Sequence, residues 1–339
     1  MGAIVRLDFP KGLAADLHKW SWESQADYDK KEGKPEAEEI ADFKPMSEIK
    51  GPFYQSTTAI AASDLDDKND YGISATDSPI EGFTVYGAKK QKSRKTAVSA
   101  EVAKDWNRTA EFMKTYVTAN VPEMIYNTKN NIVFDAINKG GFTSGAPIFD
   151  NNSADANIPS QTANLPYDAV SWFNSAHVNK SLTSYSNIFN ITTLSPTGVA
   201  NGINLANAKD MYVRFAATNA KKENNSNFNN TKDVKIITSV AGAMDWETIV
   251  NSNLDPTNSN NASNPMKGKI SKIIGSNLIT TETMSVMFRK KGLKVFTSDP
   301  KYEYWEEKEP DKFWFRISFD YIIVVDNYRY AVSNNAPLS

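Results

Sequence analysis

The segment that most constrains this chain is FWFRISFDYIIVV, at residues 313–325. Its first nine residues alternate, so one face of a strand carries Phe313, Phe315, Ile317, Phe319 and Tyr321, and the other carries Arg316, Ser318 and Asp320. The last four residues, 322–325, are apolar on both faces. The fold must therefore leave one face of the first half in contact with water and cover both faces of the second half.

Composition places the chain among ordinary globular proteins and excludes several classes of function. It has 339 residues, 40% hydrophobic and 23% charged, which is long enough for two or three domains or one large one. Its 38 basic and 40 acidic residues give a formal net charge of -2, without the basic excess typical of proteins that bind nucleic acid or anionic lipid. Because it has no cysteine, neither a disulfide framework nor a thiolate metal site can form.

No segment predicts export or membrane insertion. The first 20 residues lack the long apolar stretch of a signal peptide, since Arg6 and Asp8 interrupt it. No apolar run approaches the roughly 20 residues that a transmembrane helix needs. We therefore expect a soluble protein with no membrane partner.

The N-terminal half predicts an arm, a hairpin and a long helix. Residues 1–50 suggest an extended arm with one short helix, in which the charged run 30–39 is a solvated strap. Two segments of strand composition, 51–62 and 79–88, flank a polar, turn-rich stretch and predict a long β-hairpin. A helix is then expected from an N-cap at Ser99, kinked at Pro122 and ending at Gly140-Gly141.

The remainder alternates helices and strands and then ends in strands. Ser195-Pro196 predicts a helix start, with Val199, Ile203, Ala206, Val213 and Ala217 on one face. Further on, the sequence predicts a strand at 233–240, a helix at 241–250, and strands at 269–280, 284–296 and the C-terminal region. This order gives an α+β class.

The chain contains few residues suited to catalysis or metal binding. Of its two histidines, His18 and His177, neither belongs to an HExxH motif, and no GxSxG motif is present for a serine nucleophile. A calcium loop starting at Asp67 fails at its fifth and twelfth positions, and no Gly-rich phosphate loop exists. The basic run at 89–95 suggests a solvated linker. We expect no enzyme activity, no metal and no cofactor.

The order of these parts, together with three motifs, resembles a known family of major capsid proteins. The motifs are Gly145-Ala146-Pro147-Ile148-Phe149 after the long helix, the strand-to-helix segment at 236–250, and the terminal aromatic strand with an internal Arg at 313–321. They resemble the HK97-type major capsid proteins of tailed bacteriophages, and more narrowly the Mu-like major head subunit group. The likeness extends from Phe134 to Val332 and rests on order and pattern.

The resemblance implies an HK97-like fold with a peripheral β-sheet packed on a spine helix. It assigns residues 1–50 to the N-terminal arm and 51–98 to an extended hairpin loop. It assigns 99–165 to the spine helix and the first part of the peripheral domain. It places an inserted α/β axial domain at 166–300 and the terminal strands of the peripheral domain at 301–339.

The resemblance also implies a function and a set of partners. The chain would assemble into hexamers and pentamers of an icosahedral head around double-stranded DNA, without sequence-specific contacts. It would be found in the virion, after assembly in the cytoplasm of a bacterial host. Because the chain lacks a long charged N-terminal segment, the resemblance implies either a separate scaffolding protein or cleavage of such a segment before Met1. A portal and decoration proteins are further expected partners.

Two sets of residues follow from this expectation. The acids of the hairpin tip are expected to face basic residues of a neighbouring subunit; the set is Asp64, Asp66, Asp67 and Asp70 with Lys89, Lys90, Lys92, Arg94 and Lys95. The expected core between spine helix and terminal sheet contains Trp106, Phe315 and Phe319. Two alternatives are an encapsulin-type shell protein and a polysaccharide-binding module that uses exposed aromatic residues as stacking platforms.

Overall fold

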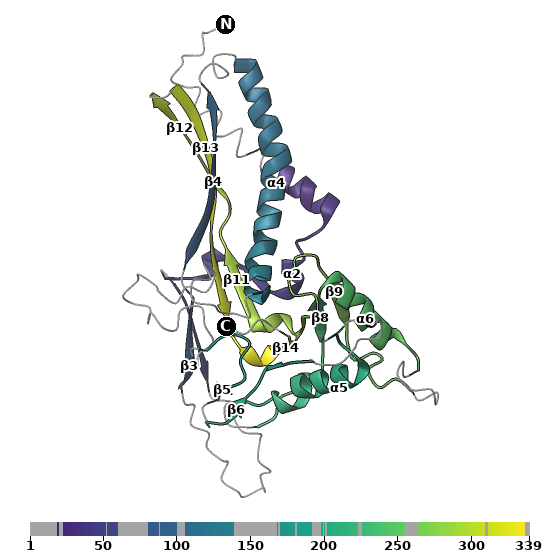
Figure 1. The fold of residues 1–339 in the computed structure, drawn as a ribbon. Coiled ribbons are helices and arrows are strands. Elements are labelled where there is room, and N and C mark those ends of the chain that lie inside the picture. The colour runs from purple at the N-terminus through teal and green to yellow at the C-terminus, as the bar shows by residue number, and fades with distance from the viewer. Residues whose placement is uncertain are drawn as a thin grey trace, which may run out of the picture.

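The computed structural model describes most of the chain and forms a long sheet, a long helix and a second, compact α/β part (Figure 1). The described residues are 23–51, 53–59, 81–87, 89–99, 106–138, 170–179, 182–191, 202–222, 226–254, 263–308 and 311–335, with the single residues 19, 168, 198 and 200. They contain two five-stranded sheets and two two-stranded ones, so the mixed helix-and-sheet class predicted from the sequence is confirmed.

The 15-residue strand β13 (Asp311–Val325) is the centre of the long sheet. Strand β4 (Lys90–Ser99) pairs with one edge of β13, while β12 (Lys301–Lys308) and β11 (Leu293–Thr297) pair in turn with the other edge. Between β11 and β12, residues 298–300 face only two residues of β13, which makes a one-residue β-bulge. Strand β1 (Asp42–Pro45) pairs in parallel with β11.

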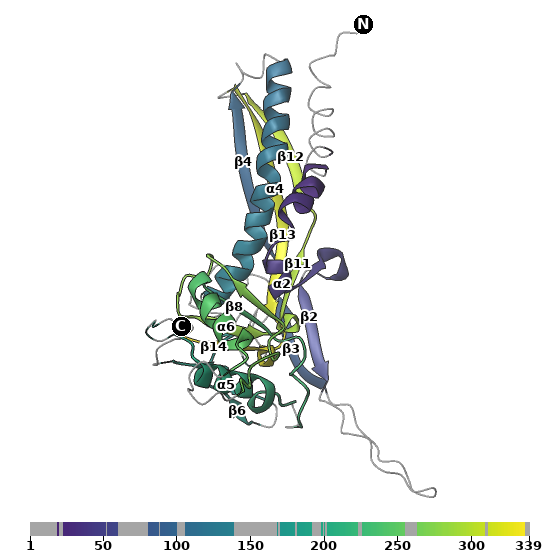
Figure 2. The ribbon, with the colours of Figure 1, turned by 90° about the vertical axis from the view of Figure 1, so that its right-hand side faces the viewer.

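Helix α4 (Trp106–Asn138) runs along one face of the long sheet and continues through Pro122 (Figures 1 and 2). Its buried residues Ile132 and Ile137 belong to one core with Phe319, Tyr321 and other odd-numbered residues of β13. On the opposite face of β13, Ile322 and Val324 form a second cluster with Val85 and Phe296. The apolar second half of β13 therefore has both faces covered, as its sequence requires.

The second layer over β13 comes from the predicted hairpin. Its strands β2 (Tyr54–Ala59) and β3 (Glu81–Gly87) pair antiparallel. Val85, near the end of β3, contributes to the cluster around Ile322. The two strands lead away from β4 and α4, toward the opposite end of the molecule (Figure 2).

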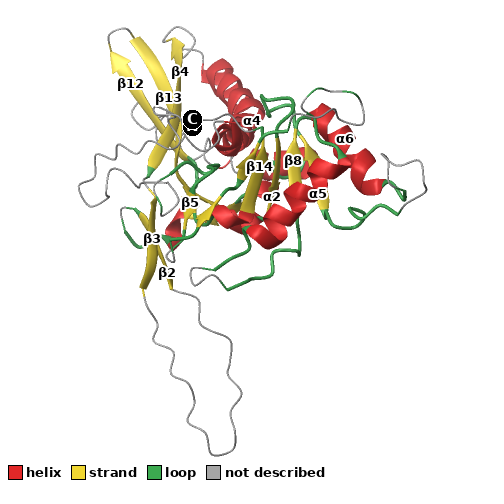
Figure 3. Ribbon diagram, turned by 60° about the horizontal axis from the view of Figure 1, so that its bottom comes forward, coloured by secondary structure: helices red, strands yellow, loops and turns green. Residues whose placement is uncertain are grey.

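The second large sheet is covered on both faces. Its strand order is β7 (Ile188–Phe189), β14 (Ala331–Asn334), β10 (Ser285–Phe288), β8 (Lys235–Thr238) and β9 (Lys272–Gly275). One face forms a core with helices α5 (Leu205–Val213) and α6 (Val240–Asn251), which contains the fully buried Trp246 (Figure 3). The other face joins the core around α4.

Smaller elements complete the described part. Helix α2 (Ala37–Ile40) follows a helix at residues 23–32, and the 3-10 turn η1 (Met46–Glu48) follows β1. Strands β5 (His177–Val178) and β6 (Ser184–Tyr185) make a short hairpin. Helix α5 continues into the π-helical turn η2 (Arg214–Thr218), the turn η3 (Lys290–Gly292) separates β10 from β11, and η4 (Tyr328–Tyr330) separates β13 from β14.

The prediction of a solvated strap at 30–39 was wrong at its C-terminal end. Ala37 and Ile40 are buried against α4, because they are the apolar positions of an otherwise charged run. The backbone N–H of Ala37 donates to Asn130 Oδ1 at 3.1 Å, and Lys129 forms an ion pair with Glu38 at 3.1 Å. The arm is therefore tied to α4 at this point.

Two predicted helix starts were also wrong. Ser99 is the last residue of β4 and not an N-cap, because residues 90–99 pair with β13 along their whole length. Helix α5 begins at Leu205, where Asn204 caps it by accepting a hydrogen bond from the Asn207 N–H at 2.9 Å. The face expected to be buried is exposed at Val213, and the buried face instead carries Leu205, Ala208 and Met211.

Residue 300, the expected boundary between the axial domain and the terminal strands, does not separate the strands of the two sheets. The segment 284–296, expected as one strand, splits into β10 and β11, which belong to different sheets. Strand β14, expected with the terminal strands of the long sheet, pairs with β10 and β7 instead. Each sheet therefore takes strands from both sides of the expected boundary.

Candidate assembly surfaces

The described residues give no evidence of a reactive centre. They contain no group of three or more His, Asp or Glu placed to hold a metal ion. His177 is fully buried, and His18 lies outside the described residues. Among the helices of the described part, none is both long and apolar enough to cross a bilayer. The surfaces that remain to be considered lie around the hairpin and along β4.

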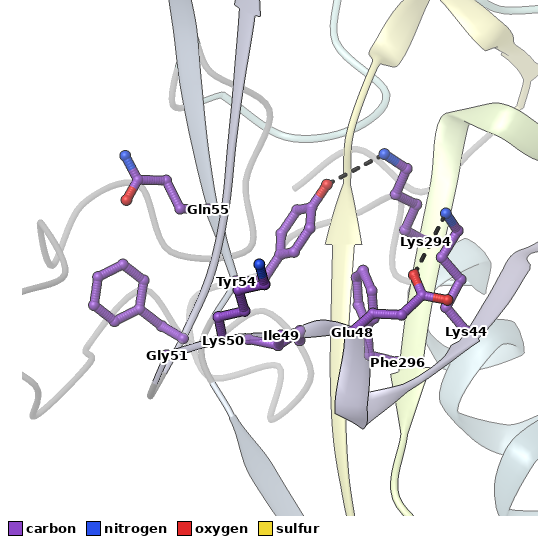
Figure 4. Close-up of a pocket in the computed structure, with 10 residues that line it drawn as sticks. Lys44, Glu48, Ile49, Lys50, Gly51, Tyr54, Gln55, Lys294 and Phe296 are labelled. Carbon is purple, nitrogen blue, oxygen red and sulfur yellow. Dashed lines mark hydrogen bonds and ion pairs between the residues drawn. The ribbon is translucent and has the colours of Figure 1, made fainter.

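A groove lies at the root of the hairpin, between β2, η1 and β11 (Figure 4). We call it the root groove, and its volume is about 430 Å³. It combines cationic side chains with aromatic ones and contains a single acid; its lining is Lys44, Glu48, Ile49, Lys50, Gly51, Phe53, Tyr54, Gln55, Lys294 and Phe296.

A polar network fastens one wall of the root groove to β13. Lys294 Nζ lies 2.9 Å from Asp326 Oδ2 and donates to the Tyr54 hydroxyl at 3.2 Å, and this hydroxyl donates to Asp326 Oδ1 at 3.2 Å. Burial by itself would lower the pKa of Lys294, but the hydrogen bond and charge of Asp326, with help from Tyr54, hold it above its ordinary value. The lysine therefore stays charged and holds β2 in place.

Close packing holds the other strand of the hairpin. A Cβ atom on Gly87 would lie 2.6 Å from Ile322 Cγ2 and 3.2 Å from Tyr54 Cβ, so only glycine allows β3 to approach β13 this closely. The rings of Tyr54 and Phe296 lie 4.7 Å apart between centroids. The hairpin root is thus fixed to its own subunit, and the sequence analysis missed this because Gly87 carries no apolar side chain.

The five basic residues expected to contact a neighbouring subunit lie in different surroundings. They form the start of β4 and the residue before it, and not a linker. Lys89 pairs with the buried Asp320 at 2.8 Å, and Lys301 of β12 pairs with the same carboxylate at 3.2 Å. Burial alone would raise the pKa of Asp320, but the hydrogen bonds from these two lysines outweigh it and hold the pKa below its ordinary value. Lys89 is therefore engaged within its own subunit.

The other basic residues divide between the two faces of the ribbon that β4, β13 and β12 form. Lys95 lies on the face away from α4, with its Nζ 4.6 Å from the Trp314 ring centroid. Lys90, Lys92 and Arg94 pair with β13 residues whose side chains face α4. Lys92 and Arg94 are exposed and line a second groove between β4 and α4.

This second groove, the β4–α4 groove, has a volume of about 360 Å³. Its floor is apolar and its rim polar, and no carboxylate lines it; the lining is Lys92, Ser93, Arg94, Met124, Ile125, Asn127, Thr128, Asn131, Ile317, Ser318 and Phe319. Of the acids of α4, Glu123 acts on Tyr28 and Asp135 on Tyr321, and neither lines the groove. The groove therefore carries two positive charges without a counter-charge among the described residues.

Some of the remaining expected site residues lie within the described part of the structure, and others do not. The acids Asp64, Asp66, Asp67 and Asp70 lie outside the described residues. Trp106 is the first residue of α4, but its side chain is also outside the description. Phe315 and Phe319 are 3% and 7% exposed, on the face of β13 toward α4.

The sequence analysis missed an aromatic pair on the opposite face of the ribbon. Trp305 of β12 and Trp314 of β13 are directly cross-strand, with ring centroids 6.2 Å apart and planes 14° from parallel. Arg316 lies over Trp305 at 5.9 Å and pairs with Glu303. Trp305 is 37% exposed. Only the strand register, which the sequence does not show, brings these residues together.

Comparison with known proteins gives structural likeness without sequence likeness. No family model matches the chain, and no curated protein matches it in sequence. The capsid of Ralstonia phage GP4 is similar at a TM-score of 0.51 and 10% identity, over 87% of this chain and 86% of that one. A structure from Mycobacterium phage Patience is similar at 0.51 and 11%, over 95% and 88%. One from Gordonia phage Cozz is similar at 0.50 and 8%, over 90% and 87%.

These likenesses define the fold. At 8 to 11% identity they extend over most of both chains, so the shared feature is the arrangement of the whole subunit. The chain has a phage capsid fold. A capsid fold is what the order of elements in the sequence had predicted.

Proposed function

We propose that the chain is a structural subunit that assembles with copies of itself into the icosahedral head of a tailed bacteriophage. The observation that carries this proposal is the fold shared with the capsid of Ralstonia phage GP4 over 87% of the chain.

The parts of the subunit take the roles that the resemblance implies. Helix α4 is the proposed spine, the long sheet the peripheral domain, and the sheet around β8 and β10 the axial domain. In the assembled head, hexamers and pentamers would enclose double-stranded DNA without reading its sequence. A scaffolding protein, a portal and decoration proteins remain proposed partners, assembly in the bacterial cytoplasm the proposed route, and the Mu-like group the proposed subfamily.

We further propose that the hairpin is the clamp between subunits. Its root is held by Gly87 and the Lys294 network, so the stem leaves its own subunit in a defined direction. That direction leads away from the β4–α4 groove of the same subunit (Figure 2). The acids of the tip, at residues 64–70, would therefore reach the uncompensated Lys92 and Arg94 of another copy.

Charge would set the register of this contact, while apolar burial would hold it. Exposed ion pairs contribute only about 0–1 kcal/mol each, so two of them cannot hold a shell together. The floor of the β4–α4 groove offers apolar surface beneath the two cations, at Met124, Ile125 and Phe319. A contact of this kind gains orientation from charge and affinity from the surface that it removes from water.

Electron microscopy of the purified protein tests the main proposal. Closed icosahedral particles are expected, and a protein that stays monomeric would contradict the proposal.

The clamp is tested separately. Deletion of residues 63–76 should leave a folded subunit that does not close shells. Reversing the four tip acids to Lys should slow assembly more at low salt than at high salt. The double variant Lys92→Glu/Arg94→Glu should fail in the same way and should recover when combined with the reversed tip. Lys232→Glu, an exposed lysine on the α/β part, is the matched control.

The two alternatives make different predictions. An encapsulin-type shell would form particles that carry an enzyme as cargo in place of DNA. A polysaccharide-binding module is favoured only by the exposed Trp305–Trp314 pair, since stacked indoles suit sugar rings. That function predicts a monomer whose migration in a gel changes with added polysaccharide, and whose response is lost in Trp305→Ala.

A further inference from the structure

Between β5 and β6 the chain holds a leucine in a backbone conformation that leucine disfavours. Leu182 has a φ of 58°, in the left-handed region. The other described non-glycine residues with positive φ are Asp233 and Asn335, whose residue types tolerate that region, whereas a bulky side chain is strained there. The Leu182 side chain is 85% exposed, more than any other large apolar side chain of the described residues. Packing within the subunit therefore does little to offset this strain.

Hydrogen bonds fix the backbone around this leucine. The Leu182 N–H donates to the carbonyl oxygen of Asn179 at 2.9 Å, and the Asn179 N–H donates to the carbonyl oxygen of Thr183 at 3.2 Å. The buried side chain of Asn179 also accepts the Thr183 N–H at 2.9 Å. These three residues, which we call the leucine turn, present the apolar side chain outward in a defined orientation. Strained residues that the surrounding structure holds in place are typical of functional positions.

A second apolar surface without cover in the subunit lies on α6. Val240 and Met244, four residues apart and so on one face of the helix, are 50% and 61% exposed. The same spacing on α5 carries the ion pair of Asp210 and Arg214, at 3.0 Å, which is typical of a helix face in water. Neighbouring exposed apolar side chains such as those of α6 are typical of a surface that another protein covers.

The leucine turn and the α6 face lie at opposite edges of the second large sheet. Strand β6 leads into β7, which is one edge strand, whereas α6 packs on β9, the other edge strand. The packing on β9 is close, since a Cβ atom on Gly275 would lie 2.7 Å from Ala243 Cβ. In both Figure 1 and Figure 3, β5 and α6 are on opposite sides of the α/β part. The two surfaces therefore cannot meet within one subunit, but they can meet between two copies placed side by side.

We propose that Leu182 of one copy packs against Val240 and Met244 on α6 of the next copy. The charges beside the two surfaces agree with this contact. Lys222 lies beside the leucine turn, with its carbonyl oxygen 3.5 Å from a side-chain nitrogen of that turn, and the exposed Glu247 lies one helical turn after Met244. Because the two surfaces differ, each copy keeps one of them free for a further copy, and a suitable rotation between neighbours closes the series into a ring. The contact rests on the proposed shell function and would join the α/β parts within a hexamer or pentamer.

Cross-linking tests the contact directly, because the chain contains no cysteine of its own. In assembled Leu182→Cys/Met244→Cys particles, a short bismaleimide should link neighbouring copies into a ladder that ends at the pentamer or hexamer on a denaturing gel. Val213→Cys/Met244→Cys is the matched control and should give no ladder, since Val213 is exposed on α5 outside the contact. An equal ladder in the control would overturn the proposal. So would the absence of a ladder from particles that electron microscopy shows to be closed, and that result would leave the shell function standing.

The variant Leu182→Gly separates the contact from folding. Glycine adopts a positive φ without strain, so the thermal midpoint of the unassembled subunit should stay the same or rise. The critical concentration for assembly should nevertheless increase about tenfold, because the variant lacks an anchoring side chain of the contact. A purely structural role of Leu182 predicts a lower midpoint instead. An unchanged critical concentration would overturn the proposal, whereas a wild-type protein that forms no oligomer would contradict the shell function as well.

Discussion

Adding a single methyl group at Gly87 should loosen the hairpin from its own subunit. In Gly87→Ala the new Cβ would lie 2.6 Å from Ile322 Cγ2, closer than real Cβ atoms approach another carbon. Ile322 is 1% exposed and packed with Val85, Phe296 and Val324, so it has no room to move aside. The strand β3 must shift instead.

The expected cost follows from this geometry. Inserting a methyl group into a well-packed core typically costs about 1–3 kcal/mol. Ile322→Ala removes the clashing Cγ2 and leaves a cavity, which by itself costs about 2–5 kcal/mol. In the double variant the methyl group added at position 87 occupies part of that cavity, so the double variant should cost less than the sum of the two single ones. The sign of this coupling is the sharper prediction.

Urea unfolding of the four proteins gives the coupling energy, and hydrogen exchange of β3 shows whether the loss is local. Gly51→Ala is the matched control, because its Cβ would meet nothing closer than the Phe53 carbonyl oxygen at 3.8 Å. Additive costs within about 0.5 kcal/mol would refute the reasoning, since they would mean that the two side chains do not compete for one space. A stable Gly87→Ala protein with unchanged exchange in β3 would do the same.

Three further predictions concern buried ionisable groups. Asp320→Asn should lower stability at pH 7 by about 1–3 kcal/mol. The wild type should also lose stability below about pH 4, because the pKa of the Asp320 carboxyl is held low in the fold. Urea unfolding across pH should show that the variant lacks this loss. Burial, aided by a nearby carboxylate, raises the pKa of Tyr321 to about 12. The wild type should therefore lose stability above about pH 10, where the unfolded chain ionises first, and Tyr321→Phe should lose less. Thermal midpoints from pH 9 to 11 measure this difference. Lys294→Met leaves Asp326 without its cation and should cost more than Tyr54→Phe, which removes one hydroxyl worth about 0.5–1.5 kcal/mol; denaturant midpoints in the reverse order would contradict this.

Local patterns in the sequence predicted the elements whose signal is contained in a short segment. The alternation in 313–321 gave the two faces of β13, and the two strand-like segments gave the hairpin. Burial of Ala37 was missed because its partner, Asn130, lies 93 residues away in α4. The split of 284–296 into β10 and β11 was not predicted. Apolar residues flank the turn at Lys290–Gly292 on both sides, so the segment has the composition of one continuous strand.

The candidate surfaces show the same limit more strongly. A run of lysines and arginines is visible in the sequence, but its division between two faces of a ribbon depends on pairing with β13. Asp320 pairs with Lys89, which directly precedes β4, and with Lys301 of β12, so three distant segments make one ion cluster. His177 contacts both Asp168, nine residues before it, and Tyr328, which is far away in the sequence. No spacing within the sequence indicates such contacts.

The order of the strands along the chain sets the order in which the two sheets can form during synthesis. Strand β8 emerges about 90 residues before β14, and β11 precedes its partner segment of β13 by more than 20 residues. At about 5–20 residues per second, β8 and β10 wait several seconds for β14. The long sheet is complete only when residue 325 has left the ribosome and the second sheet only when residue 334 has, so a nascent chain has no finished surface to offer another copy. A subunit would therefore present its complete sheets to other copies only after nearly the whole chain has been synthesised.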